Sequence, residues 1–172
     1  VGGDYFDFHV TKDRLTFVLG DVSGKGTGAA LIMTVLRAAV RDHWLDADLI
    51  AALGQMNNLV TQNVPANKYV TFFLGRLDLA TGHLEYVNAG HNAPILSRGS
   101  GGVERLTTGG MVLGLFEDAP YESGSTTIDP EDRLVVFTDG FSETWNNKGD
   151  ELGEDGLTSF VLDLKGTSAS AM

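Results

Sequence analysis

The chain has 172 residues, and 23 acidic against 12 basic side chains give it a formal net charge of −11. Such a surface repels nucleic-acid phosphates, which argues against a DNA- or RNA-binding protein. Cysteine is absent, so disulfides, thiol nucleophiles and thiolate metal sites are excluded. No apolar run reaches the roughly 18 residues that span a membrane, and we expect a cytoplasmic protein without membrane insertion here. The length fits one domain over residues 1–172.

The first part of the chain predicts two strands followed by two helices. Residues 5–10 and 15–19 are rich in β-branched and aromatic side chains, as strands are. A helix over 29–44 is apolar around most of its circumference, which predicts that it is buried. A second helix over 46–62 carries one apolar stripe and ends before Pro65.

The rest of the chain predicts a series of strands and a final helix. A hairpin loop at 80–82 separates the first two of these strands. Because strands and helices do not alternate regularly, we expect an α+β fold with antiparallel sheets and helices packed on them. The predicted strands cover 69–79, 84–89, 93–97, 103–106, 121–128 and 133–138, and the helix runs from Glu154 to Lys165.

Three aspartates stand beside glycines at the ends of predicted strands: Asp4, Asp21 and Asp139. A carboxylate in that position can point into a cleft while the backbone approaches a ligand closely. Hard oxygen ligands suit Mg²⁺ or Mn²⁺, and two such ions could activate a water molecule as a nucleophile. Aspartate beside glycine also marks ordinary turns, so spacing alone leaves both interpretations open.

The glycine-rich segment 20–28 invites comparison with nucleotide-binding loops. It fails the Walker pattern at two positions, and its glycines are spaced G-x-G-x-G, not G-x-G-x-x-G. We therefore regard a nucleotide-binding loop as a minor alternative. Its backbone and Lys25 could still contact a phosphate, although Lys25 is equally well explained as a solvated lysine.

Four motifs, taken together, resemble the SpoIIE-type PPM phosphatases, the bacterial branch of the protein phosphatase 2C-like superfamily. They occur in the order in which that family has them, and the resemblance extends from residue 1 through most of the chain. The motifs are VGGDYFD at 1–7, GDVSGKG at 20–26, NAGHNAP at 88–94 and FTDGFSE at 137–143.

The resemblance implies a β-sandwich of two antiparallel sheets flanked by helices, with two Mn²⁺ or Mg²⁺ ions at one end. It implies that Asp21 bridges both ions and that the Val22 carbonyl lies beside it. Asp139 would bind one ion and Asp4 the other, directly or through water. Asp7 is a candidate for supporting these ligands.

Two further motif residues have open roles. His91 could donate a proton to a leaving seryl oxygen, but we favour a histidine that anchors the local turn by hydrogen bonds. Glu143 could support Asp139, although a solvated side chain is the preferred interpretation.

The chain departs from the family pattern at its end. Family members usually close with an Asp-Asp or Asp-Asn pair before a last strand, and nothing similar follows Leu164. We therefore expect a domain truncated at both ends, whose own activity is doubtful.

The function that the resemblance implies is hydrolysis of phosphoserine or phosphothreonine on a protein, with an anti-sigma-factor antagonist as the expected substrate. It also implies an N-terminal sensor or receiver domain in the parent chain and a homodimer as one assembly state. The alternative is a catalytically degenerate module that keeps the phosphatase fold and binds a protein partner.

Overall fold

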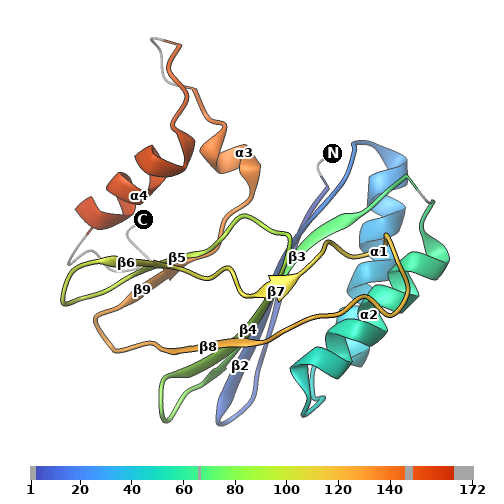
Figure 1. The fold of residues 1–172 in the computed structure, drawn as a ribbon, viewed down its shortest axis with the longest axis horizontal. Helices are drawn as coiled ribbons and strands as arrows, with labels where there is room; N and C mark the ends of the chain where they lie inside the picture. Colours follow the sequence, from blue (N-terminus) through green and yellow to red (C-terminus); the bar gives the residue numbers. More distant parts are fainter. Residues whose placement is uncertain (1–2, 66, 146–148, 165–172) are drawn as a thin grey trace.

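The computed structural model describes residues 3–65, 67–145 and 149–164, which form two sheets and four helices (Figure 1). The larger sheet has the order β1-β2-β3-β4-β7, and β8 also pairs with β4. The smaller sheet has the order β6-β5-β9.

The larger sheet contains β1 (Asp4–Val10), β2 (Arg14–Val22), β3 (Val70–Asp78), β4 (His83–Ala89), β7 (Gly109–Gly110) and β8 (Gly124–Thr127). The smaller sheet contains β5 (Ile95–Ser97), β6 (Val103–Arg105) and β9 (Arg133–Val135). The helices are α1 (Thr27–Asp42), α2 (Leu49–Asn63), α3 (Asp139–Ser142) and α4 (Gly153–Asp163).

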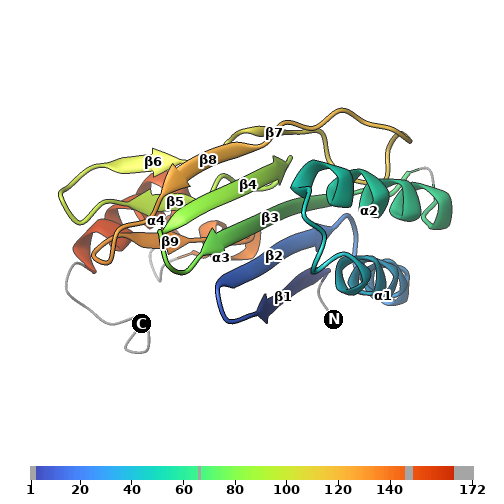
Figure 2. The same ribbon diagram turned by 90° about the horizontal axis from the view of Figure 1, so that it is seen from below.

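The elements form layers, with the two sheets between two sets of helices. Helices α1 and α2 cover one face of the larger sheet, and α4 lies on the far side of the smaller one (Figures 1 and 2). This arrangement confirms the predicted α+β sandwich flanked by helices. One pairing differs from the prediction, because β7 joins β4 in parallel and makes the larger sheet mixed. In the described residues, no helix is long and apolar enough to cross a membrane.

The largest core cluster lies between the larger sheet and helices α1 and α2. The predicted stripe of α2 is fully buried there, at Leu49, Leu53, Met56 and Val60. The prediction that α1 is buried all round is wrong, because Leu31 is 70% exposed. Helix α1 packs through one face only, because it lies on the outside of the sheet, and Met33 is partly buried at the margin of this face.

A second cluster fills the space between the sheets. Phe73 and Tyr86 stack there with ring centroids 5.7 Å apart, and Leu106 packs against them. Strand β3 therefore contributes to both cores, because alternate side chains point to opposite faces. A third cluster joins α4 to the smaller sheet through Leu157, Val161 and Ile95.

Several element ends differ from the sequence prediction. Helix α2 begins later than expected, because the Asp48 side chain caps it by accepting hydrogen bonds from the Ile50 and Ala51 N–H groups. Strand β9 ends at Val135, so Asp139 begins the short helix α3, which the sequence did not predict. The predicted end of the last helix at Lys165 and the region after Leu164 lie outside the described residues.

Asn57 ties α2 to the loop that leads into β8. Its fully buried side chain donates to the Phe116 carbonyl at 2.8 Å and accepts from the Gly114 N–H at 3.0 Å. The neighbouring Asn58 makes two bonds to Asp118, but these are exposed to solvent.

We expect Asn57→Ala to lower the free energy of unfolding by about 1–3 kcal/mol, because it leaves two backbone groups without partners. Asn58→Ala is the matched control and should cost clearly less, since water can replace its exposed bonds. Urea denaturation of both variants measures the difference. Equal losses would show that burial of the Asn57 network contributes nothing.

Candidate active site

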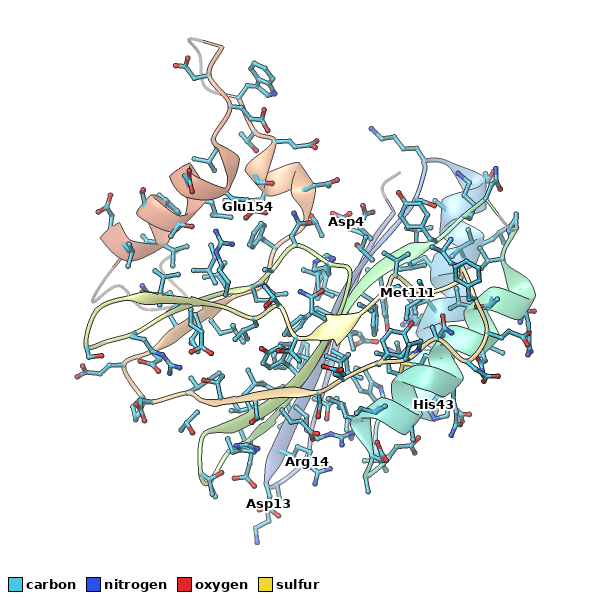
Figure 3. All side chains as sticks on the ribbon, viewed as in Figure 1. Asp4, Asp13, Arg14, His43, Met111 and Glu154 are labelled. Carbon is cyan, nitrogen blue, oxygen red and sulfur yellow. The ribbon has the colours of Figure 1, made fainter. Side chains whose placement is uncertain are left out.

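The first two aspartates lie opposite each other across two strands. In the register of β1 and β2, Asp4 pairs with Asp21, and Asp21 pairs in turn with Thr71 of β3. Residues opposite in such a ladder share one face of the sheet, so all three side chains lie on the face toward the smaller sheet. Figure 3 shows Asp4 at the end of the sandwich far from Asp13 and Arg14.

The backbone is packed closely at this end. A Cβ atom at Gly3 would lie 2.6 Å from the Val22 carbonyl oxygen and 2.9 Å from the Asp21 Oδ1 atom. Glycine is therefore required at position 3, and it keeps Asp21 and the Val22 carbonyl close to the start of β1. Val22 itself is buried, and its N–H donates to the Gly3 carbonyl at 3.2 Å.

The loop after β2 is held by residues that precede β3. The Ser23 N–H donates to the Tyr69 carbonyl, and the Ser23 hydroxyl accepts from the Tyr69 N–H, both at 2.9 Å. Gly24 has φ of 98°, a conformation that favours glycine, and Lys68 lies directly against it. Lys25 is exposed in the same loop. Two lysines therefore flank the turn that follows Asp21.

The third aspartate reaches the same region from the far end of the chain. Asp139 is exposed at the start of α3, and the preceding Thr138 donates its hydroxyl proton to Asp4 Oδ2 at 3.0 Å. This bond connects residues that are 134 positions apart and fixes the junction before α3 against β1. Thr138 was not singled out from the sequence, because only the fold brings it to Asp4.

The clustered carboxylates perturb one another. Burial, followed by the charges of Asp4 and Asp139, raises the pKa of Asp21 to about 6. A cation or hydrogen bonds would favour the charged form of such a carboxylate, and a hydrogen bond from the Val22 backbone already acts in that direction. Asp4, Asp21 and Asp139 thus form one electrostatic group, the acidic unit.

The donors suit a hard divalent cation in kind and in charge, since carboxylate and carbonyl oxygens are what Mg²⁺ and Mn²⁺ prefer. In the part of the chain that the structure describes, however, no three His, Cys, Asp or Glu side chains lie close enough together to hold a metal ion. Asp4 lies opposite Asp21 in the strand register, and Asp139 acts on Asp21 through its charge. Metal binding is therefore a prediction that rests on chemistry and placement.

His91 extends the row of polar side chains on the sheet. It is buried, its Nδ1 lies 2.9 Å from the Thr71 hydroxyl, and its backbone N–H donates to Asn88 Oδ1 at 2.7 Å. Burial lowers the pKa of His91 below its ordinary value, although the Phe137 backbone and the charges of Asp139 and Asp4 oppose this. Among the described residues, no group makes a well-formed hydrogen bond with its Nε2. The contacts of His91 with Thr71 and Asn88 are those of an anchoring residue.

Asp7 lies on the opposite face of β1 from Asp4, because side chains alternate along a strand. It pairs with Arg41 of α1 at 3.2 Å and accepts a hydrogen bond from the Tyr5 hydroxyl at 3.1 Å. Burial acts to raise the pKa of Asp7, but hydrogen bonds from the Phe8 N–H, Arg41 and Tyr5 outweigh it and lower the pKa. The structure therefore places Asp7 with α1, not with the acidic unit.

An apolar groove of about 410 Å³ begins beside Asp4. It passes between Phe6 of β1 and Phe160 of α4, and Phe137 and Phe141 also line it. Phe6 is 75% exposed, so the groove presents aromatic surface next to the acidic unit.

The fold defines a class of protein. The chain superposes over 97% of its length on the SiaA-PP2C domain of Pseudomonas aeruginosa, with a TM-score of 0.81, 21% identity and coverage of 68% of that chain. It also superposes over 95% of its length on the RsbU and RsbW domains of Rv1364c from Mycobacterium tuberculosis, with a TM-score of 0.79, 30% identity and coverage of 45% of that chain. The molecule therefore has the PP2C-like phosphatase fold.

The family follows from the sequence comparison. The model of the SpoIIE family, described as stage II sporulation protein E, matches residues 11–172, and the chain belongs to this family. Phosphoserine phosphatase RsbU of Bacillus subtilis is 29% identical over 87% of this chain and 45% of its own length. Phosphoserine phosphatase RsbP of the same organism is 26% identical over 81% of this chain and 36% of its own length. The chain thus spans less than half the length of these relatives.

Proposed function

We propose that this chain is the catalytic domain of a metal-dependent phosphatase that hydrolyses phosphoserine or phosphothreonine on a protein. One observation carries the proposal: Asp4 and Asp21 face each other across β1 and β2, and Asp139 lies near enough to raise the pKa of Asp21. Two relatives that are named phosphoserine phosphatases support the reaction type.

Four residues at this end of the sandwich would form the metal site. Asp21, the Val22 carbonyl, Asp4 and Asp139 would hold two Mn²⁺ or Mg²⁺ ions. Such ions, when bound, lower the pKa of a coordinated water and neutralise the phosphoryl oxygens. Thr138 would hold the Asp4 carboxylate in orientation through its 3.0 Å bond.

Lys25 and His91 would act around this centre. Lys25 is exposed in the loop after β2, so its amino group would be accessible to a phosphorylated segment of a substrate. His91 would be neutral at pH 7, because burial lowers its pKa, and would anchor β3 through Thr71. Asp7 would support the site indirectly, because its ion pair with Arg41 holds α1 against β1.

The wider role is also a proposal. The substrate would be a phosphorylated anti-sigma-factor antagonist, the parent chain would carry a sensor or receiver domain before residue 1, and the protein would act in the cytoplasm, with a homodimer as one assembly state. The names of RsbU and of a solved RsbU–RsbW domain pair favour a partner-switching pathway of this type.

One observation favours the second candidate, a module that binds a protein partner without catalysis. Within the described ranges no three ligand-type side chains are close enough to hold a metal ion. A degenerate member would keep the fold and the aromatic groove but would not turn over phosphate.

Phosphate release from a phosphoserine protein, with Mn²⁺ or with a chelator, separates the two candidates. The full-length parent is the protein to use. Asp13→Asn serves as the control for Asp21→Asn, because Asp13 lies at the far end of the sheet (Figure 3). The phosphatase proposal predicts turnover that needs Mn²⁺ and that Asp13→Asn retains. Absence of turnover with any added divalent metal would favour the binding module.

A further inference from the structure

A second pocket lies on the free edge of β1, directly next to the acidic unit. It measures about 260 Å³ and is lined by four consecutive residues of β1, Asp4–Asp7, and by Met33, Arg37 and Arg41 of α1. Strand β1 is the outermost strand of its sheet, so side chains from both of its faces reach this pocket. Asp4 therefore belongs to the pocket and to the acidic unit at once.

The two arginines of the pocket differ in their ion pairing. Arg41 pairs with Asp7 at 3.2 Å, and the Tyr5 hydroxyl also binds that carboxylate. Arg37 is exposed and makes no hydrogen bond or ion pair within the described part of the chain. Because Arg37 and Arg41 lie one helical turn apart, their like charges repel each other, and only one of them is compensated. The pocket thus keeps one guanidinium available for an anion.

The position of that guanidinium suits a peptide that enters the site. A phosphoserine bound at the acidic unit would place its neighbours about 3.3–3.6 Å further along for each extended residue. Because the pocket that Arg37 lines also includes Asp4, a residue flanking the phosphoserine would come close to Arg37. The overall charge of −11 repels an acidic segment, so a local positive group would favour its approach.

We propose that Arg37 selects phosphoprotein segments that carry an acidic side chain next to the phosphoserine. This inference rests on the proposed phosphatase function and adds a preference among its substrates. Arg41 contributes by neutralising Asp7, which would otherwise repel the incoming carboxylate. Arg37 is a specificity residue, because it contacts the flanking side chain and not the phosphoryl group.

Two phosphoserine peptides that differ only in the flanking residue, Asp in one and Lys in the other, test the proposal on the full-length protein. The wild type should favour the Asp peptide in kcat/KM by roughly two- to fivefold, the range that one exposed ion pair supplies. Arg37→Ala should bring this ratio close to one, Arg37→Lys should retain most of it, and Arg37→Glu should invert it. Added salt should weaken the preference, because exposed charges are screened.

Arg14→Glu is the matched control. Arg14 is also an exposed arginine, but it lies at the opposite end of the sandwich from Asp4 (Figure 3). Arg14→Glu makes the same change in net charge as Arg37→Glu. If the two variants change the ratio of kcat/KM for the two peptides equally, the proposal is overturned. A wild type that hydrolyses both peptides equally well would overturn it too. If the wild type hydrolyses neither peptide, the phosphatase proposal fails, and the ratio of the two peptide dissociation constants still decides the role of Arg37.

Discussion

Replacing Asp21 by asparagine should reduce Mn²⁺-dependent phosphate release by on the order of 10²–10³-fold or more, the scale seen when one preorganised electrostatic group is removed. Asp21 is the centre of the acidic unit, since it faces Asp4 directly and feels the charge of Asp139. Asparagine keeps the size and one oxygen of the side chain but loses the negative charge that would help to hold the cations. Steady-state kinetics with a phosphoserine protein, in the full-length parent, measure the loss.

The same substitution should stabilise the protein when no metal is present. Because the folded-state pKa of Asp21 is raised to about 6, its protonated form is favoured by folding. The stability that this contributes is complete below the unfolded-state value of about 4 and is lost as the pH rises to about 6. At pH 7 in a chelator, Asp21→Asn should therefore gain stability, by at most about 1 kcal/mol, because Asp21 is only partly buried and water screens its neighbours. A loss of stability there would contradict the electrostatic account of the site.

Replacing Phe72 by alanine should lower the free energy of unfolding by about 3–5 kcal/mol, the usual cost of emptying a buried phenylalanine position. Phe72 is fully buried between the larger sheet and the helices, and its ring lies against Gly20, where an added Cβ would meet it at 2.8 Å. The ring therefore supports the end of β2 from which Asp21 projects. Denaturant unfolding measures the loss, and Mn²⁺-dependent turnover should fall with the folded fraction.

Phe116→Ala provides the control for that experiment. Phe116 is 61% exposed in the loop before β8, and its known bond to Asn57 uses only its backbone carbonyl. The variant should change stability by no more than about 0.5 kcal/mol, as surface substitutions usually do. Similar losses in the two variants would mean that Phe72 does not occupy the well-packed core described above.

Much of the fold could be predicted because its signals are local. The stripe of α2 and the paired strands around residues 80–82 follow from side-chain periodicity and turn chemistry, and the structure contains all of them. Leu31 shows the limit of this approach. An apolar helix looks the same in sequence whether it is enclosed or lies on the outside of a sheet, and only the layer order decides between the two.

The candidate site could be predicted in part. Asp4 and Asp21 were identified from glycine-flanked strand ends, and the β1–β2 register places them opposite each other. Thr138 and Arg37 could not be identified, because a threonine beside an aspartate and an arginine on a helix surface carry no signal of their own. Their roles become visible only in the fold, which brings Thr138 to Asp4 and places α1 beside β1. The supporting role of Asp7 was implied by the family resemblance alone, and strand alternation directs its side chain to α1.

A Mn²⁺ titration followed by electron paramagnetic resonance tests the proposal that the acidic unit binds divalent cations. The full-length wild type should take up Mn²⁺ and remove the signal of the free ion, Asp13→Asn should do the same, and Asp21→Asn should leave most of the ion free. Equal uptake by Asp21→Asn and the wild type would contradict the proposal, because the cation would then be held elsewhere.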